Sequence, residues 1–121
     1  MRVLGAIIWT ISWHVSVSQG LGVSDQFPQY WTFDGTPTLL LGGSVEDNLF
    51  QIEDLEEQLD LLASVGGNYV RNTMSSRDEG NVWAFYFDES ANQYDLSRWN
   101  EEYWRRFEGL LALTSERKIV V

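Results

Sequence analysis

The stretch IEDLEEQLDLLASVGGNYVR, residues 52–71, joins a helix pattern to a strand pattern. Its isoleucine and leucine residues recur at steps of three and four with acidic residues between them, which is typical of an amphipathic helix. The pair Gly66 and Gly67 predicts the end of this helix. The short apolar run 68–70 then predicts a strand, and Arg71 follows it directly. A permanent cation at the end of a buried strand indicates a partner carboxylate nearby.

Similar patterns lie on both sides of this stretch. Asp34 and Gly35 stand between two apolar runs, which predicts a β-hairpin because both central positions of its tight turn need positive φ. Apolar runs at 38–41 and 119–121 predict further strands, and an apolar stripe over 99–114 predicts a second helix. The expected order is therefore hairpin, strand, helix, strand, helix, strand.

Helices between strands favour right-handed βαβ units and a parallel sheet. We therefore expect an α/β fold, the N-terminal part of a (β/α)8 TIM barrel (about three of its eight strands) preceded by a β-hairpin. A complete barrel needs about 250 residues, and an exposed apolar strand at the end of a chain would promote aggregation. We thus expect residues 21–121 to be the N-terminal fragment of a larger domain.

Residues 1–20 have the order of a secretory signal peptide: a basic start at Arg2, a short apolar run, and then small residues. The apolar run is too short to span a bilayer, which takes roughly 20 residues. A secreted or periplasmic protein is expected, and a buried N-terminal strand or helix is the alternative. The single histidine, His14, lies in this segment and is assigned no chemistry. Because cysteine is absent, stability has to come from the core without disulfides.

The charge balance restricts the partners of the chain. It has 18 acidic and 8 basic side chains and a formal net charge of −10. Binding to a phosphate backbone needs clustered Lys and Arg, so nucleic acid is not expected as a partner. An anionic membrane surface is disfavoured for the same reason, and no integral membrane segment is expected in the mature chain.

In a barrel of the expected kind, the loops that follow the strands form the active face. These loops would be 42–48 and 72–95. The second is longer than most structureless loops and contains several aromatic residues, in which disordered segments are poor. We therefore interpret it as ordered cover over a site.

Three motifs in order resemble one known family. The motifs are FDGTP leading into LLLG (33–42), GNYVR (67–71), and YDLSRW (94–99) with Tyr103, Phe107 and SERKIVV (115–121). Together they resemble the opening of clan A glycoside hydrolases, the cellulase- and mannanase-like (β/α)8 barrels. The resemblance runs from about residue 31 to residue 121. It departs from the family at Gly42-Gly43-Ser44, where many members have Gly-x-Asn, so no substrate contact is expected from that motif.

The resemblance implies a role for Arg71. In the family, an arginine at the end of the second strand binds the nucleophilic carboxylate and keeps it ionised, as a neighbouring cation does. The alternative is a structural ion pair with Glu46 or Asp47. The two catalytic glutamates of the family would lie on the fourth and seventh strands, beyond this chain, about 5–5.5 Å apart for a retaining mechanism. No catalytic residue is therefore expected within these 121 residues.

Loop residues supply the candidate carbohydrate contacts. We assign substrate binding to six side chains: Glu46, Asp47, Asn72, Arg77, Asp78 and Trp83. The carboxylates, with Glu79, would bind sugar hydroxyls or else be solvated charges. The Trp83 ring would stack on a pyranose or else pack in the core.

The sequence has no motif for binding a nucleotide, a phosphate or a metal ion. The glycine pairs do not have the spacing of a dinucleotide or phosphate loop, and no metal-ligand cluster is present, so neither a cofactor nor a metal is expected. The sequence thus predicts a secreted glycoside hydrolase. The alternatives are a non-catalytic barrel-like carbohydrate- or surface-binding protein and an unrelated barrel enzyme.

Overall fold

The computed structural model describes residues 20–121, which fall into two compact units, one ending at Thr38 and the other spanning Leu39–Val121. The predicted signal peptide, except Gly20, lies outside the described residues, and so does His14.

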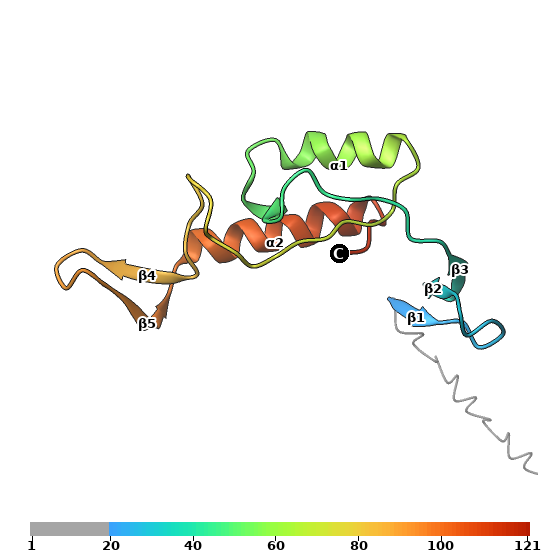
Figure 1. Ribbon diagram of the computed structural model, residues 1–121, viewed down its shortest axis with the longest axis horizontal. Coiled ribbons are helices and arrows are strands. Elements are labelled where there is room, and N and C mark those ends of the chain that lie inside the picture. The colour runs from blue at the N-terminus through green and yellow to red at the C-terminus, as the bar shows by residue number, and fades with distance from the viewer. Residues whose placement is uncertain (1–19) are drawn as a thin grey trace, which may run out of the picture. The chain divides into compact units, whose positions relative to one another are not determined.

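The first unit is a small antiparallel sheet (Figure 1). Its strands β1 (Leu21–Val23), β2 (Trp31–Phe33) and β3 (Thr36–Thr38) lie in the order β1-β2-β3. The turn between β2 and β3 has positive φ at both central residues, 50° at Asp34 and 75° at Gly35. The hairpin predicted from this pair is therefore confirmed.

The second unit contains two helices and one hairpin (Figure 1). In chain order its elements are the 3-10 turn η1 (Leu49–Gln51), α1 (Leu55–Ser64), β4 (Phe85–Asp88), β5 (Gln93–Trp99) and α2 (Glu101–Glu116). Strands β4 and β5 pair antiparallel. Both predicted helices are present, and each begins two or three residues later than its apolar pattern.

The helix ends follow from local hydrogen bonds. The Asn100 side chain accepts a hydrogen bond from the Glu102 amide at 3.1 Å and so caps the start of α2. At the end of α1, the Gly66 amide donates to Ala63 and the Gly67 amide to Leu62, which satisfies carbonyls left free by the helix.

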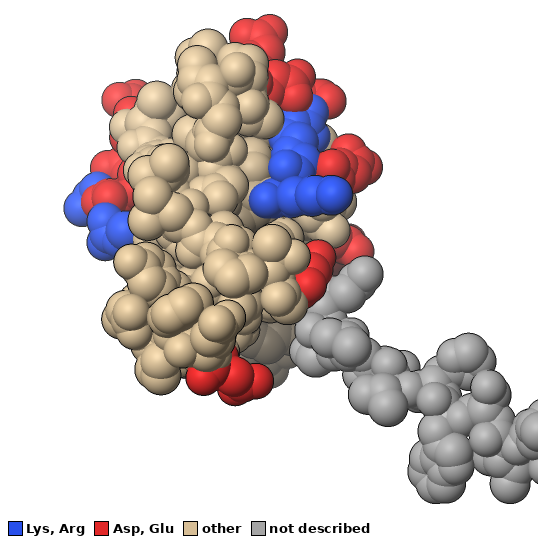
Figure 2. All heavy atoms as spheres, turned by 90° about the vertical axis from the view of Figure 1, so that its right-hand side faces the viewer, with Lys and Arg blue, Asp and Glu red and all other residues tan. Residues whose placement is uncertain are grey.

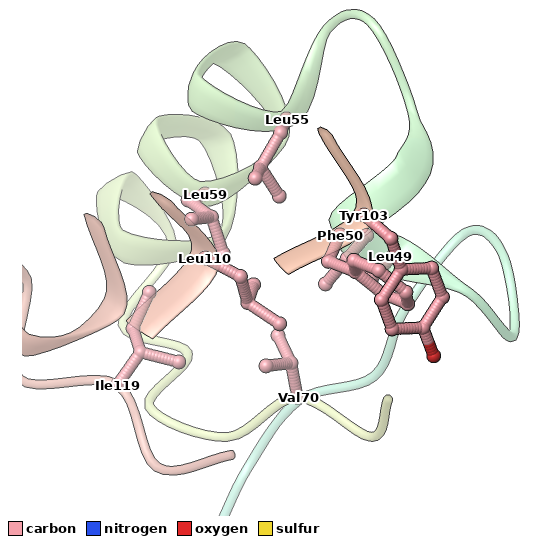
Figure 3. Close-up of a cluster of buried hydrophobic side chains, with 8 residues drawn as sticks. All are labelled: Leu49, Phe50, Leu55, Leu59, Val70, Tyr103, Leu110 and Ile119. Carbon is pink, nitrogen blue, oxygen red and sulfur yellow. The ribbon is translucent and has the colours of Figure 1, made fainter. Parts of the chain in front are cut away.

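The core lies between η1, α1, α2 and the segments that follow the helices (Figure 3). Its rings meet edge to face, with centroids 4.9 Å apart for Phe50 and Tyr103. The buried apolar residues are Leu49, Phe50, Leu55, Leu59, Val70, Tyr103, Leu110 and Ile119. Burying side chains of this size contributes roughly 1.5–3 kcal/mol each, so this cluster is what keeps the two helices together.

The prediction that this chain forms the N-terminal part of a TIM barrel is wrong. In the described residues both sheets are antiparallel, and no alternating β/α pattern of parallel strands is present. The segments expected as parallel strands meet only in single bridges, Gly42 with Tyr69 and Tyr69 with Val120. One reason is that the Asn68 side chain takes the place of a strand backbone. Its Nδ2 donates to the Leu39 carbonyl at 3.0 Å and its Oδ1 accepts from the Leu41 amide at 2.8 Å.

The second correction concerns residues 72–95, expected as one long loop. The hairpin β4–β5 occupies the end of this segment and continues to Trp99, where the second helix was expected to begin. Alternating residues of β4 face opposite sides, and Asn92, with φ 51°, permits the turn. The sequence signal for this hairpin was the aromatic run 85–87, followed by a polar turn and a second run of residues that favour strands.

Replacing Lys118 with glycine should stabilise the protein. Lys118 follows α2 with φ 55°, whereas Gly66 holds the corresponding position after α1 with φ 82°. A side chain in the left-handed region costs roughly 1–2 kcal/mol, and glycine returns about half of that through its greater unfolded-state entropy. We expect Lys118→Gly to raise the free energy of unfolding by up to about 1 kcal/mol, as measured by urea denaturation. Gly66→Ala should lower it, and a Lys118→Gly variant less stable than wild type would contradict this explanation.

Candidate functional site

Four of the predicted site residues meet in one group of charges, here called the Asp47 cluster: Asp47, Arg71, Arg77 and Asp78. Asp47 Oδ1 accepts from Arg71 Nη1 and its Oδ2 from Arg77 Nη2, both at 3.1 Å. The Arg77 Nε donates to Asp78 at 3.1 Å. Asp47 therefore lies between two guanidinium groups. The ion pair between Arg71 and a neighbouring acid, left open by the sequence, is formed with Asp47.

Two buried amides position this cluster, and sequence reasoning did not identify either of them. Asn48 is 2% exposed; its Nδ2 donates to Asp78 and its Oδ1 accepts from the Thr73 hydroxyl at 3.0 Å. Gln51 is 6% exposed and holds the segment 75–82. Its Nε2 donates to the carbonyls of Ser75 (3.3 Å) and Val82 (3.0 Å), and its Oε1 accepts from the Val82 amide at 2.9 Å.

Further hydrogen bonds hold the base of the segment that carries Arg71 and Arg77. The Thr73 amide donates to the Asp47 carbonyl at 2.6 Å. The Tyr103 hydroxyl, on α2, donates to the Met74 carbonyl at 2.8 Å, and burial raises the pKa of this phenol. The backbone of the site is therefore fixed by buried groups, while the charged ends of its side chains face solvent.

The charges of the cluster stabilise one another in the ionised state. The Arg77 pKa is raised above its ordinary value, first by the hydrogen bond to Asp78 and then by that to Asp47. The side chains of Arg71 and Arg77 are 64% and 65% exposed, and those of Asp47 and Asp78 are 42% exposed. Exposed ion pairs of this kind add little to stability, so the cluster is better suited to binding than to holding the fold.

The other three predicted contacts lie in different surroundings. Asn72 Oδ1 accepts from the Phe50 amide at 3.2 Å, which makes this side chain part of the scaffold. Glu46 lines an open pocket of about 700 Å³ together with Asp78. Trp83 is 53% exposed and lies against Tyr94, with ring centroids 5.3 Å apart.

The pocket next to the cluster is mostly polar. Its lining includes Gln51 and the Arg106 side chain, which donates to Glu102 at 2.7 Å and to the Gln51 carbonyl at 3.4 Å. The Glu102 pKa is lowered, first by Arg106 and then by Arg105. These acids and bases offer both donors and acceptors to a polar ligand.

Acidic and basic side chains are mixed on the face of the molecule shown in Figure 2. In the view of Figure 2, basic side chains lie beside acidic ones and form no broad basic patch. Within residues 20–121, no group of three or more His, Asp or Glu side chains is placed to hold a metal ion. The helices of the same region are not long and apolar enough to cross a membrane.

Comparison with known proteins leaves the family open. No protein-family model, curated protein or solved structure matches this chain. The resemblance to clan A glycoside hydrolases therefore stays a prediction from the sequence motifs.

Removal of Gln51 should destabilise the chain far more than removal of Asp47. Gln51→Ala leaves three backbone groups without a partner inside the protein, which should cost about 2–3 kcal/mol in the free energy of unfolding. Asp47→Ala removes only exposed ion pairs and should change the melting temperature little. Gln58→Ala is the matched control, because the Gln58 side chain donates to Asp54 at the surface. Equal effects of Gln51→Ala and Gln58→Ala in thermal unfolding would contradict the positioning role.

Proposed function

We propose that this chain is the substrate-contacting part of a secreted or periplasmic glycoside hydrolase that cleaves O-glycosidic bonds of a poly- or oligosaccharide. The mechanism would be a retaining one with two glutamates, which we place beyond residue 121. The observation that carries the proposal is the arrangement at Arg71: a guanidinium oriented by Asp47, still 64% exposed, in a cluster whose Asp78 lines a polar pocket.

Arg71 would keep a nucleophilic carboxylate ionised and correctly oriented. Its contact with Asp47 uses one nitrogen, Nη1, so other N–H groups of the fork stay available for a second carboxylate. A cation beside a carboxylate lowers its pKa, and paired donors fix its plane. Asp47, itself held by Arg77, would restrict the Arg71 side chain before substrate binds.

The remaining groups of the site suit the hydroxyls of a neutral sugar. Carboxylates accept and guanidinium groups donate, and a sugar hydroxyl can do both. Asp47, Asp78 and Arg77 offer both kinds of group within one cluster, and Glu46 extends them into the pocket. The net charge of −10 favours neutral glycans over polyanionic ones.

A non-catalytic carbohydrate-binding protein is the second candidate, and one observation favours it. Three carboxyl groups, Asp88, Asp95 and Glu102, have a pKa below the ordinary value, because hydroxyl, amide or guanidinium donors stabilise the charged form. A general acid for glycoside cleavage needs a raised pKa, so none of these three acids suits that role. The two candidates differ in whether catalytic glutamates are supplied from outside residues 1–121.

Arg71→Ala should impair turnover without unfolding the protein. In a chain extended past residue 121 that contains the two glutamates, we expect kcat on an aryl glycoside to fall by about 100-fold or more, the usual effect of losing one donor to a reacting group. The melting temperature should change little, since Arg71 is exposed. Arg98→Ala, which removes an exposed arginine of β5 that does not line the polar pocket, is the control. An unchanged kcat in Arg71→Ala would exclude Arg71 from the site, and turnover by the 121-residue chain itself would contradict the location of the glutamates.

A further inference from the structure

One face of the β4–β5 hairpin carries exposed aromatic rings that the core does not use. Phe87 and Tyr94 are direct partners across the two strands, and their ring centroids are 5.0 Å apart. Trp83 precedes β4 and adds its ring at 5.3 Å from Tyr94. The exposed fractions of Trp83, Phe87 and Tyr94 are 53%, 40% and 38%. We call these three residues the aromatic platform.

Contacts with α2 hold the hairpin that carries the aromatic platform. A two-stranded hairpin is marginally stable alone, but this one is attached to α2, and in Figure 1 it extends beyond the N-terminal end of that helix. The Ala84 carbonyl accepts from the Asn100 amide at 3.0 Å and from Trp104 Nε1 at 3.2 Å. The Phe85 and Trp99 rings stack at 4.9 Å, and Trp99 meets Trp104 edge to face at 5.1 Å.

The opposite face of the hairpin is already occupied. There the Arg98 guanidinium lies 3.8 Å from the centre of the Tyr86 ring, so a cation covers this aromatic surface. Phe85, Tyr86 and Trp99 are thus paired within the chain. The rings of Trp83, Phe87 and Tyr94 remain open to a partner.

We propose that the aromatic platform of Trp83, Phe87 and Tyr94 binds a neutral glycan by stacking its rings on the apolar faces of pyranose units. This inference rests on the proposed function and names the substrate class and the surface that receives it.

Charge distinguishes a glycan from the other possible occupants. The hairpin carries Asp88, Glu89 and Asp95 against one arginine, and the chain has a net charge of −10. Nucleic acid and anionic glycans would be repelled, and so would a second copy of this chain with the same charge. A neutral sugar meets no such repulsion. Flat, rigid aromatic side chains also lose little conformational entropy when they bind.

The test is a titration of the full chain with neutral oligosaccharides of glucose, mannose and xylose. Binding is followed by calorimetry and by tryptophan fluorescence, for wild type, Trp83→Ala, Tyr94→Ala and Tyr86→Ala. Tyr86→Ala is the matched control, since Tyr86 is 41% exposed on the other face of the same hairpin. We expect Trp83→Ala and Tyr94→Ala each to weaken binding of the best ligand by about tenfold, the effect of losing one stacking ring. The affinity of Tyr86→Ala should match that of wild type.

The other outcomes contradict either the aromatic platform or the proposed function. Binding by wild type that survives in Trp83→Ala and Tyr94→Ala overturns the platform and leaves the proposed function standing. Equal losses in all three variants mean that the hairpin acts only through its fold, which also overturns the platform. No binding of any neutral glycan by wild type contradicts the proposed function itself. A dimer in sedimentation velocity that Trp83→Ala dissociates would assign the platform to a second copy of the chain instead.

Discussion

Two buried side-chain amides support the candidate site of this protein. Asn48 precedes the turn η1 and Gln51 is its last residue, and both are almost fully inaccessible to solvent. A buried amide without partners is costly, so the native fold has to supply donors and acceptors to both. The segment 73–82 provides them through backbone groups, one hydroxyl and one carboxylate. A stretch with no helix or strand of its own is thereby fixed in one conformation.

The chemistry of the Asp47 cluster depends on this support. Arg77 and Asp78 extend from the segment that the amides hold, and Arg71 and Asp47 come from backbone joined at Thr73. The charged ends contribute little to stability because water screens them. They are nevertheless preorganised, because the groups below them are buried and paired. An exposed, oriented pair of arginines is available to a carboxylate or a sugar at a low entropic cost.

Local sequence signals predicted local structure well. The helix stripes, the glycines after α1 and the Asp34-Gly35 hairpin all depend on neighbours within a few residues, and all are present. The prediction of a parallel sheet was wrong because short apolar runs do not reveal whether their backbones form a ladder of hydrogen bonds. Here the Asn68 side chain makes some of the hydrogen bonds that a strand backbone would make. Asn48 and Gln51 were missed for a related reason: their partners lie 24 to 31 residues away in the chain. The sequence could predict that Asp47, Arg71 and Arg77 belong to one site, because each of them follows a predicted strand.

Hydrogen exchange at single amides tests directly whether the buried amides fix the site. The Val82 N–H donates to Gln51 Oε1, and Val82 belongs to neither a helix nor a strand. If the side chain holds the segment, this amide should exchange about as slowly as amides of α2, and Gln51→Ala should accelerate it while the α2 amides keep their protection. Exchange of the Val82 amide at the rate of an unstructured peptide in the wild-type chain would contradict the account.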